Sequence, residues 1–257
     1  MTINPRKLVA ISLGGLAAIG APALDIVSAK GTPGPKPNVK LKGLAVLGAA
    51  SLSDVFKTMA PNVHYSFAGS DQLAFQVEQG AVADVFASSN TKYPDKLFAA
   101  GLVERPVIFT RNRLVVIVPK ANPAAITSVA DLTRPGIKLV IGDATVPVGA
   151  YTRTVFGRLG LNAALENVVS NEPDVRGVVS KVTLGEADAG VAYVTDLYLR
   201  RAKMTAIAID PRAQPTVAYE VAVIKSGKHQ DKALAFVRYL QSTEGKAFLT
   251  RFGFVPA

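Results

Sequence analysis

Cysteine is absent from the 257-residue chain, and histidine occurs only twice. The lack of cysteine excludes disulfide bonds, thiolate metal sites and a lipid-modified cysteine behind a signal peptide. The two histidines, His64 and His229, do not have the spacing of paired metal ligands, and we expect both to be surface or structural residues. The sequence therefore predicts no site for a metal cation.

The common catalytic patterns are also missing. The chain contains no Gly-x-Ser-x-Gly elbow, no Walker loop, no dinucleotide-binding glycine pattern and no His-Glu-x-x-His. These absences weigh against serine hydrolases, nucleotide-dependent enzymes and zinc proteases. We expect a binding protein rather than an enzyme, without a cofactor.

The net charge of +10 is not concentrated on a folded surface. Residues 1–42 carry half of it, and the basic side chains of the remaining chain are scattered rather than clustered. No basic stripe interleaved with aromatic residues is found, so nucleic acid is not an expected partner.

The first forty residues have the pattern of an export signal. Arg6 and Lys7 precede an apolar run over residues 8–20, and Val27-Ser28-Ala29 fits a cleavage site. The run is shorter than the ~20 residues that a membrane-spanning helix needs. We predict a signal peptide over residues 1–29, cleaved after Ala29, and a proline-rich linker over 30–40; an uncleaved N-terminal anchor is the alternative. The protein is expected to be exported, to the periplasm or another extracytoplasmic location.

The rest of the chain alternates short apolar strands with amphipathic helices, which predicts an α/β fold. Two similar sets of elements meet near Pro119. We therefore expect two lobes, each a mixed, mostly parallel sheet flanked by helices, with a ligand cleft between them. The first lobe is predicted to hold residues 41–118 and 217–257, and the second to hold 119–216.

Four turns that join a predicted strand to a helix could form a site in that cleft. They contain Ser51, Ser70, Pro147-Val148 and Asp174-Val175, and none carries Lys, Arg or His at its tip. Ser51 with Asp54 three positions later resembles a capping box. Helix N-termini offer free N–H groups, and a site of neutral donors suits a fully deprotonated oxyanion. The alternative is that all four are ordinary helix caps.

Motifs along residues 44–257 resemble the family of periplasmic molybdate-binding proteins of ABC importers. They are Ala49-Ala50-Ser51-Leu52, Phe67-Ala68-Gly69-Ser70, Ala83-Asp84-Val85-Phe86-Ala87, Val146-Pro147-Val148-Gly149-Ala150-Tyr151, Asp174-Val175-Arg176-Gly177, Gly190-Val191-Ala192-Tyr193 and Arg251-Phe252-Gly253-Phe254. Each motif alone is weak, whereas the full set in this order is fairly specific.

The resemblance implies a two-lobed, type II periplasmic-binding-protein fold that closes on molybdate or tungstate. It implies that the anion is bound by the hydroxyls of Ser51, Ser70 and Tyr193 and by the backbone N–H groups of Val148 and Val175. Molybdenum would be present only as the oxyanion, bound by these same residues. The implied partner is the membrane permease of an ABC importer, and the protein is expected to be a monomer.

Two positions depart from the family pattern. Val148 stands where a smaller residue is common, which is tolerable if only its N–H is used. Asp71 follows Ser70 where the family often has a hydroxyl. We expect Asp71 to cap its own helix; the alternative is that it accepts a proton from a protonated oxyanion such as phosphate. A receptor for phosphate or sulfate, an exported hydrolase on a related scaffold, and a protein that kept the fold but lost the ligand are the other hypotheses.

Overall fold

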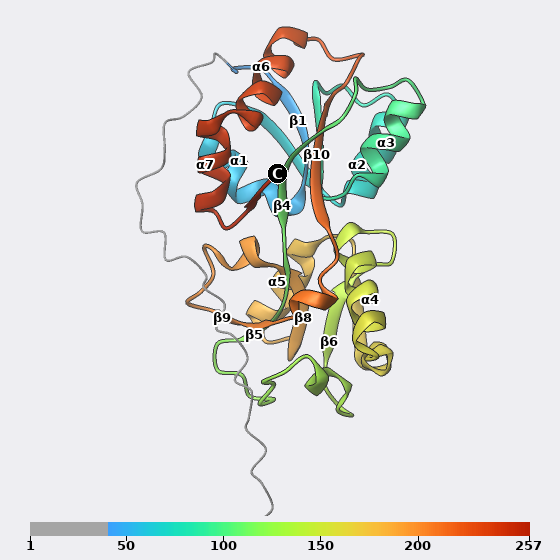
Figure 1. Ribbon diagram of the computed structural model, residues 1–257, viewed down its shortest axis with the longest axis vertical. Coiled ribbons are helices and arrows are strands. Elements are labelled where there is room, and N and C mark those ends of the chain that lie inside the picture. Colours follow the sequence, from blue (N-terminus) through green and yellow to red (C-terminus); the bar gives the residue numbers. More distant parts are fainter. Residues whose placement is uncertain (1–40) are drawn as a thin grey trace, which may run out of the picture.

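Two sheets organise the protein. The computed structural model describes residues 41–257; the predicted signal peptide (1–29) and linker (30–40) lie outside the described residues. The first sheet has the order β11-β4-β10-β3-β1-β2 and the second the order β7-β6-β8-β5-β9. Figure 1 shows one sheet above the other, each with its own helices. We call these units the first and the second lobe.

The first lobe contains β1 Ala45–Ala49, η1 Ala50–Leu52, α1 Ser53–Met59, β2 His64–Ala68, α2 Ser70–Glu78, β3 Val85–Ser88, α3 Lys92–Ala99, β4 Val107–Asn112, β10 Val217–Val223, α6 Gln230–Gln241, α7 Thr243–Arg251 and β11 Val255–Pro256. The second lobe contains β5 Leu114–Pro119, η2 Ala130–Thr133, β6 Leu139–Gly142, α4 Pro147–Leu159, η3 Asn162–Asn167, β7 Val168–Glu172, α5 Val175–Leu184, β8 Ala189–Tyr193, η4 Val194–Leu197, β9 Met204–Ala208 and η5 Pro211–Ala213. Here η denotes a 3₁₀ helix.

The predicted two-lobed α/β fold with mixed sheets is confirmed, but the sheets are not mostly parallel, because four strand pairings are parallel and five are antiparallel. In the first sheet β1 pairs in parallel with β2 and β3, whereas β10, β4 and β11 are antiparallel to their neighbours. In the second, β6 pairs in parallel with β7 and β8, and β5 is antiparallel to β8 and β9. The parallel halves matter most for function, because ligands bind beyond the carboxyl ends of such strands.

The chain crosses from the first lobe to the second between β4 and β5 and returns before β10. The predicted boundary after residue 118 placed β5 in the first lobe, but β5 lies in the middle of the second sheet. The crossing is therefore at Arg113. A continuous apolar run is compatible with burial in either sheet, so the sequence of β5 does not tell which sheet it joins.

Two apolar cores support this arrangement. One lies between the first sheet and helices α2 and α3, and includes Leu47, Leu73, Phe86 and Leu97. The other covers the opposite face of the first sheet and continues into the second lobe without interruption. The two lobes therefore share a core, and the residues between them are fixed by packing from both sides.

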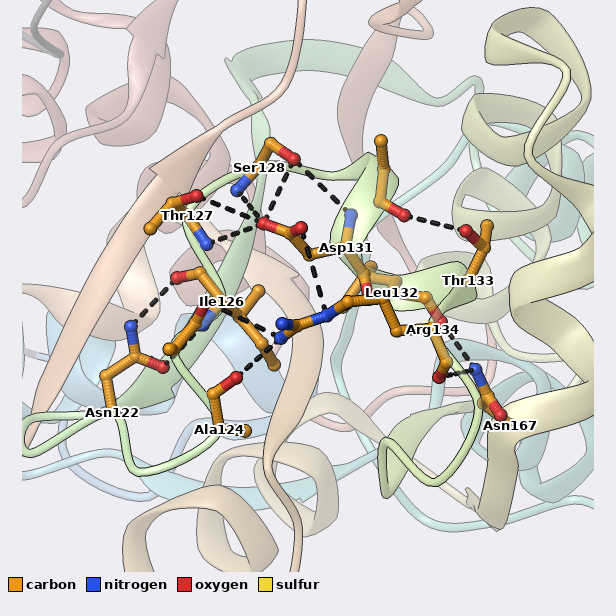
Figure 2. Close-up of polar contacts among 12 residues, drawn as sticks. Asn122, Ala124, Ile126, Thr127, Ser128, Asp131, Leu132, Thr133, Arg134 and Asn167 are labelled. Carbon is orange, nitrogen blue, oxygen red and sulfur yellow. Dashed lines mark hydrogen bonds and ion pairs between the residues drawn. The ribbon is translucent and has the colours of Figure 1, made fainter.

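A polar cluster holds the long connection from β5 to β6 (Figure 2). The Asp131 carboxylate accepts hydrogen bonds from the backbone N–H groups of Thr127 and Ser128, each at 2.8 Å. These bonds lower the pKa of Asp131 to about 2. Asn167 donates to the carbonyl oxygens of Leu132 and Arg134, at 2.7 and 2.8 Å. The cluster fixes the base of the second lobe and lies outside the cleft.

The described residues contain no helix that is long and apolar enough to cross a membrane.

Candidate functional site

A cavity lies where the two lobes meet. It is lined by Ala49, Ala50, Ser51, Ala68, Gly69, Ser70, Ser89, Val146, Pro147, Val148, Asp174, Val175 and Tyr193. All five residues predicted to bind the anion are in this set, although they come from five separate segments. Each of the five is at most 5% exposed. The structure therefore brings the predicted residues together around one cavity.

Ser51 lies on the 3₁₀ helix η1, directly beyond the carboxyl end of β1. The predicted capping box was wrong, because neither η1 nor α1 has a side-chain cap. Instead the Ser51 hydroxyl lies 2.8 Å from the Tyr219 hydroxyl. Ser51 is thus held by a distant strand of the same lobe rather than by its own helix.

Ser70 begins α2 beyond the carboxyl end of β2. Its hydroxyl accepts a hydrogen bond from the backbone N–H of Ser89 at 3.1 Å and lies 3.3 Å from the Ser89 hydroxyl. The Ser89 N–H occupies one acceptor position of the Ser70 hydroxyl, whose proton can be donated either to the Ser89 hydroxyl or to a ligand. Ser89 itself lines the cavity just beyond β3, although it was not predicted as a site residue.

Asp71 does not take the role that we expected. Among the described residues, no backbone N–H of α2 donates to the Asp71 carboxylate, so the predicted helix-cap role is not observed. The Asp71 carboxylate instead accepts a hydrogen bond from Thr145 of the second lobe at 3.1 Å, and Asp71 is not among the residues that line the cavity. The cap prediction failed because it considered only residues next to Asp71 in sequence.

The second lobe contributes the N-termini of α4 and α5. Pro147 occupies the first turn of α4, as predicted, where no N–H is needed, and Val148 follows it. At α5 the Asp174 side chain accepts hydrogen bonds from the N–H groups of Arg176 and Gly177, at 2.7 and 3.2 Å. This cap leaves the N–H of Val175 as the first-turn donor beside the cavity.

Tyr193 ends β8 and is 1% exposed. Its hydroxyl is buried and makes no hydrogen bond of normal geometry among the described residues, although the Ser89 side chain lies near enough to oppose the rise of its pKa. Burial raises the pKa of Tyr193 well above its usual value, with Tyr219 and Tyr151 adding to the shift, so the hydroxyl remains protonated at neutral pH. A buried donor without a partner costs free energy, and an anionic acceptor in the cavity would satisfy it.

Polar contacts across the cleft hold the lobes together around the cavity. Asp54 of α1 forms ion pairs with Arg176 at 2.7 Å and Arg200 at 2.8 Å, both in the second lobe. Arg176 also donates to the carbonyl oxygen of Ala50 at 3.2 Å and to the Ser53 hydroxyl. On another side of the cavity, the Tyr93 hydroxyl donates to the carbonyl oxygen of Thr145 at 2.6 Å. We call the group Asp54, Arg176 and Arg200 the clasp.

A buried carboxyl lies behind Tyr193. Asp196 accepts a hydrogen bond from the Tyr193 N–H at 3.0 Å, while its other oxygen has no partner among the described residues. Burial raises the pKa of Asp196 to about 6, against the opposing effect of Arg176. The carboxyl therefore titrates near neutral pH in the folded protein.

This titration gives a testable pH dependence. The folded protein retains a proton on Asp196 that the unfolded chain loses near pH 3.8, so the free energy of unfolding should fall between that pH and about 6. The full effect is about 3 kcal/mol. In Asp196→Asn, which mimics the protonated acid, the part of the decline that Asp196 causes should be absent. The part caused by Glu220, whose pKa burial raises to about 7, should remain. Urea denaturation of both proteins from pH 4 to 8 measures the difference; parallel pH profiles would contradict the assignment.

Three residues around the site were not predicted from the sequence: Ser89, Asn112 and Tyr219. Ser89 follows a strand within the polar stretch Ser88-Ser89-Asn90, and this position was a usable signal. Asn112 and Tyr219 contact the site only through other side chains, so no local pattern indicates them.

The predicted structural roles of the histidines are borne out for His229, whose Nδ1 lies 3.1 Å from Asp84, and His64 is exposed on β2.

Two α/β lobes that enclose a cavity of helix N-termini and hydroxyls define the class of two-lobed solute-binding proteins. The comparisons with known proteins agree: the chain belongs to the family of bacterial extracellular solute-binding proteins, whose model matches residues 44–255. The family is one of binding proteins rather than of enzymes.

Relatives refine this picture. The chain is 36% identical over 228 residues to the molybdate-binding protein ModA of Mycobacterium tuberculosis, covering 85% of this chain and 86% of that protein. The periplasmic molybdate-binding protein of Azotobacter vinelandii is similar in structure, with a TM-score of 0.76 and 21% identity over 83% of this chain and 99% of that one. The sulfate-binding protein SubI of M. tuberculosis has a TM-score of 0.68 and 19% identity, covering 83% and 86%. The last two show the fold alone.

Proposed function

We propose that this protein is an exported receptor that binds molybdate between its lobes and delivers it to the permease of an ABC importer. One observation carries the proposal: donors from five separate segments surround a cavity, and the described residues that line it include no Lys, Arg or His. The donors are the hydroxyls of Ser51, Ser70 and Tyr193 and the N–H groups of Val148 and Val175. The 36% identity to a molybdate-binding protein supports the same ligand.

The donor set fits a fully deprotonated oxyanion, which accepts hydrogen bonds but cannot give them. Molybdate at neutral pH is such an anion, and tungstate has the same charge and shape. Among the described residues of the lining, the one with a charged side chain is Asp174, whose Oδ1 is occupied by two N–H groups of its own helix. The helix N-termini supply partial positive charge in place of a cationic side chain.

Sulfate is the second candidate, because the same fold occurs in a sulfate-binding protein and sulfate is also fully deprotonated. Phosphate fits less well, since at neutral pH it carries a proton that needs an acceptor. Asp71, the acceptor that the sequence suggested for this role, does not line the cavity. Its Oδ2 accepts a hydrogen bond from Thr145, and its Oδ1 is buried without a partner among the described residues.

The remaining parts of the proposal rest on the sequence. A signal peptide over residues 1–29 would direct export and be cleaved after Ala29. The mature protein would act as a monomer, with the permease and the anion as its partners and no nucleic acid. The surface that meets the permease would include both lobes, because only their closed arrangement reports a bound anion.

Calorimetric titration with molybdate, tungstate, sulfate and phosphate tests the proposal. We expect molybdate and tungstate to bind tightly. Ser51→Ala and Ser70→Ala should each lower the affinity for molybdate by about 100-fold, because each removes a hydrogen bond to a charged ligand. Ser66→Ala is the matched control: Ser66 is exposed on β2, the strand that precedes Ser70. Absence of binding to all four anions would exclude an oxyanion receptor. Binding of phosphate alone would show that molybdate is not the ligand.

A further inference from the structure

A chain of buried hydrogen bonds reaches Ser51 from behind the cavity. The Asn112 Nδ2 donates to the Tyr219 hydroxyl at 3.3 Å, and the Tyr219 hydroxyl lies 2.8 Å from the Ser51 hydroxyl. Asn112, Tyr219 and Ser51 are 4%, 0% and 5% exposed. Tyr219 itself is not among the residues that line the cavity. We call these three residues the relay.

The proton positions along the relay follow from its other contacts. The Asn112 Oδ1 accepts the backbone N–H of Arg113 at 2.9 Å, which fixes the amide with Nδ2 toward Tyr219. Of the two Nδ2 protons, one is donated to the Thr195 hydroxyl at 3.0 Å and the other to Tyr219. Tyr219 therefore accepts from Asn112, and its own single proton is free to be donated to Ser51.

The same logic decides what Ser51 offers the ligand. A serine hydroxyl that accepts a hydrogen bond from Tyr219 has its one proton left for another acceptor. Because Ser51 lines the cavity, this remaining proton can be donated to a ligand in the cavity. If Tyr219 were absent, the hydroxyl could rotate and present a lone pair to the ligand instead. A lone pair repels an anion but accepts a proton from a protonated one.

Packing fixes Tyr219 in this position. Its ring makes edge-to-face contacts with Phe109, Tyr193 and Phe254, with centroid distances of 6.3, 5.9 and 5.5 Å. Burial raises the pKa of Tyr219 far above its usual value, so the hydroxyl keeps its proton. The ring cannot turn away without breaking these contacts.

We propose that Tyr219 is a positioning residue that determines specificity: it aims the Ser51 proton into the cavity and so selects fully deprotonated oxyanions over protonated ones. The proposal rests on the proposed function, because it assigns the origin of selectivity at the same site. Asn112 sets the direction of hydrogen-bond donation along the relay, from Asn112 through Tyr219 to Ser51. Its bond to Thr195 connects the relay to the second lobe.

A double-mutant cycle tests this role. Calorimetry measures the affinities for molybdate and phosphate of the wild type, Tyr219→Phe, Ser51→Ala and the double variant at neutral pH. Tyr219→Phe should lower the affinity for molybdate about tenfold, because the hydrogen bond that orients Ser51 is lost. The ratio of the affinities for molybdate and phosphate should also decrease. In the Ser51→Ala background the same change should have no effect, because Tyr219 acts only through Ser51.

The control is Tyr65→Phe, which removes another hydroxyl of the first lobe; among the described residues, this hydroxyl donates to the carbonyl oxygens of Phe56 and Ala60 and not to a site residue. It should leave both affinities unchanged. Equal weakening by Tyr219→Phe in both backgrounds would show a merely structural role and overturn the relay while leaving the receptor function intact. Failure of the wild type to bind molybdate would overturn the proposed function itself, and the proposed selectivity with it.

Discussion

Replacing Gly149 by alanine is expected to destabilise the second lobe strongly and to abolish anion binding. A Cβ at this position would lie 1.9 Å from the carbonyl oxygen of Asp143 and 2.3 Å from that of Gly142. Both atoms belong to the backbone, so no side-chain rotation relieves the overlap. The N-terminus of α4 would have to move away from β6, taking the N–H of Val148 with it. We expect a loss of about 3 kcal/mol or more in the free energy of unfolding.

Helix α4 provides its own control. Gly157 is exposed on the same helix, and a Cβ there would meet only the Asn162 Oδ1, at 4.0 Å. Gly157→Ala should stabilise the protein by about 0.5–1 kcal/mol, because alanine is the better helix former. Urea denaturation and molybdate titration of both variants give the comparison. Wild-type stability and affinity in Gly149→Ala would show that the close contact between α4 and the end of β6 is not required.

Helices were the most predictable elements of the fold. The sequence pattern predicts one helix over Val175–Leu184, ended by Gly185, and another over Thr243–Arg251. Helices α5 and α7 have these bounds. Both helices start after a capping side chain, Asp174 and Ser242, that accepts a hydrogen bond from its own first turn. Such signals act within a few residues of sequence, so they can be recognised without knowing the rest of the fold.

The arrangement of the strands was less predictable, since it depends on contacts between distant segments. β4, Val107–Asn112, was not predicted, and β5 was placed in the wrong lobe although its apolar pattern was clear. Which strand pairs with which is decided by the tertiary structure rather than by local pattern. Because β4 was not predicted, its last residue, Asn112, was not recognised as part of the site either.

The residues of the candidate site show the same difference between local sequence signals and contacts between distant segments. The residues whose donors face the cavity lie in strand-to-helix turns and could be predicted from that position together with the family motifs. The residues that orient them could not: Ser51 and Tyr219 are separated by 168 positions, and Asp54 and Arg200 by 146. Ser51 illustrates the error that results, because a local interpretation made it a helix cap when its actual partner is on β10.

The clasp leads to the second large expected effect. Asp54 belongs to the first lobe and its two arginines to the second, so opening the cleft separates both ion pairs. The side chains of the three residues are between 22% and 26% exposed, which limits screening by water. Burial opposes ionisation of Asp54, but the hydrogen bonds from Arg200 and Arg176 outweigh it and lower its pKa below 3.8. The clasp is therefore charged at neutral pH, and its contribution is lost only as the pH falls through that lowered pKa.

Asp54→Asn should consequently favour the open arrangement of the lobes. It removes the negative charge that holds Arg176 and Arg200 together and leaves two like charges facing the first lobe. Since the anion is enclosed only when the lobes meet, we expect the affinity for molybdate to fall between about 10- and 100-fold. Small-angle scattering of the ligand-free variant should also show a larger radius of gyration than that of the wild type. Asp210→Asn is the control, because Asp210 pairs with the exposed Arg212 within the second lobe. Equal affinities in the two variants would show that the clasp does not contribute to closure.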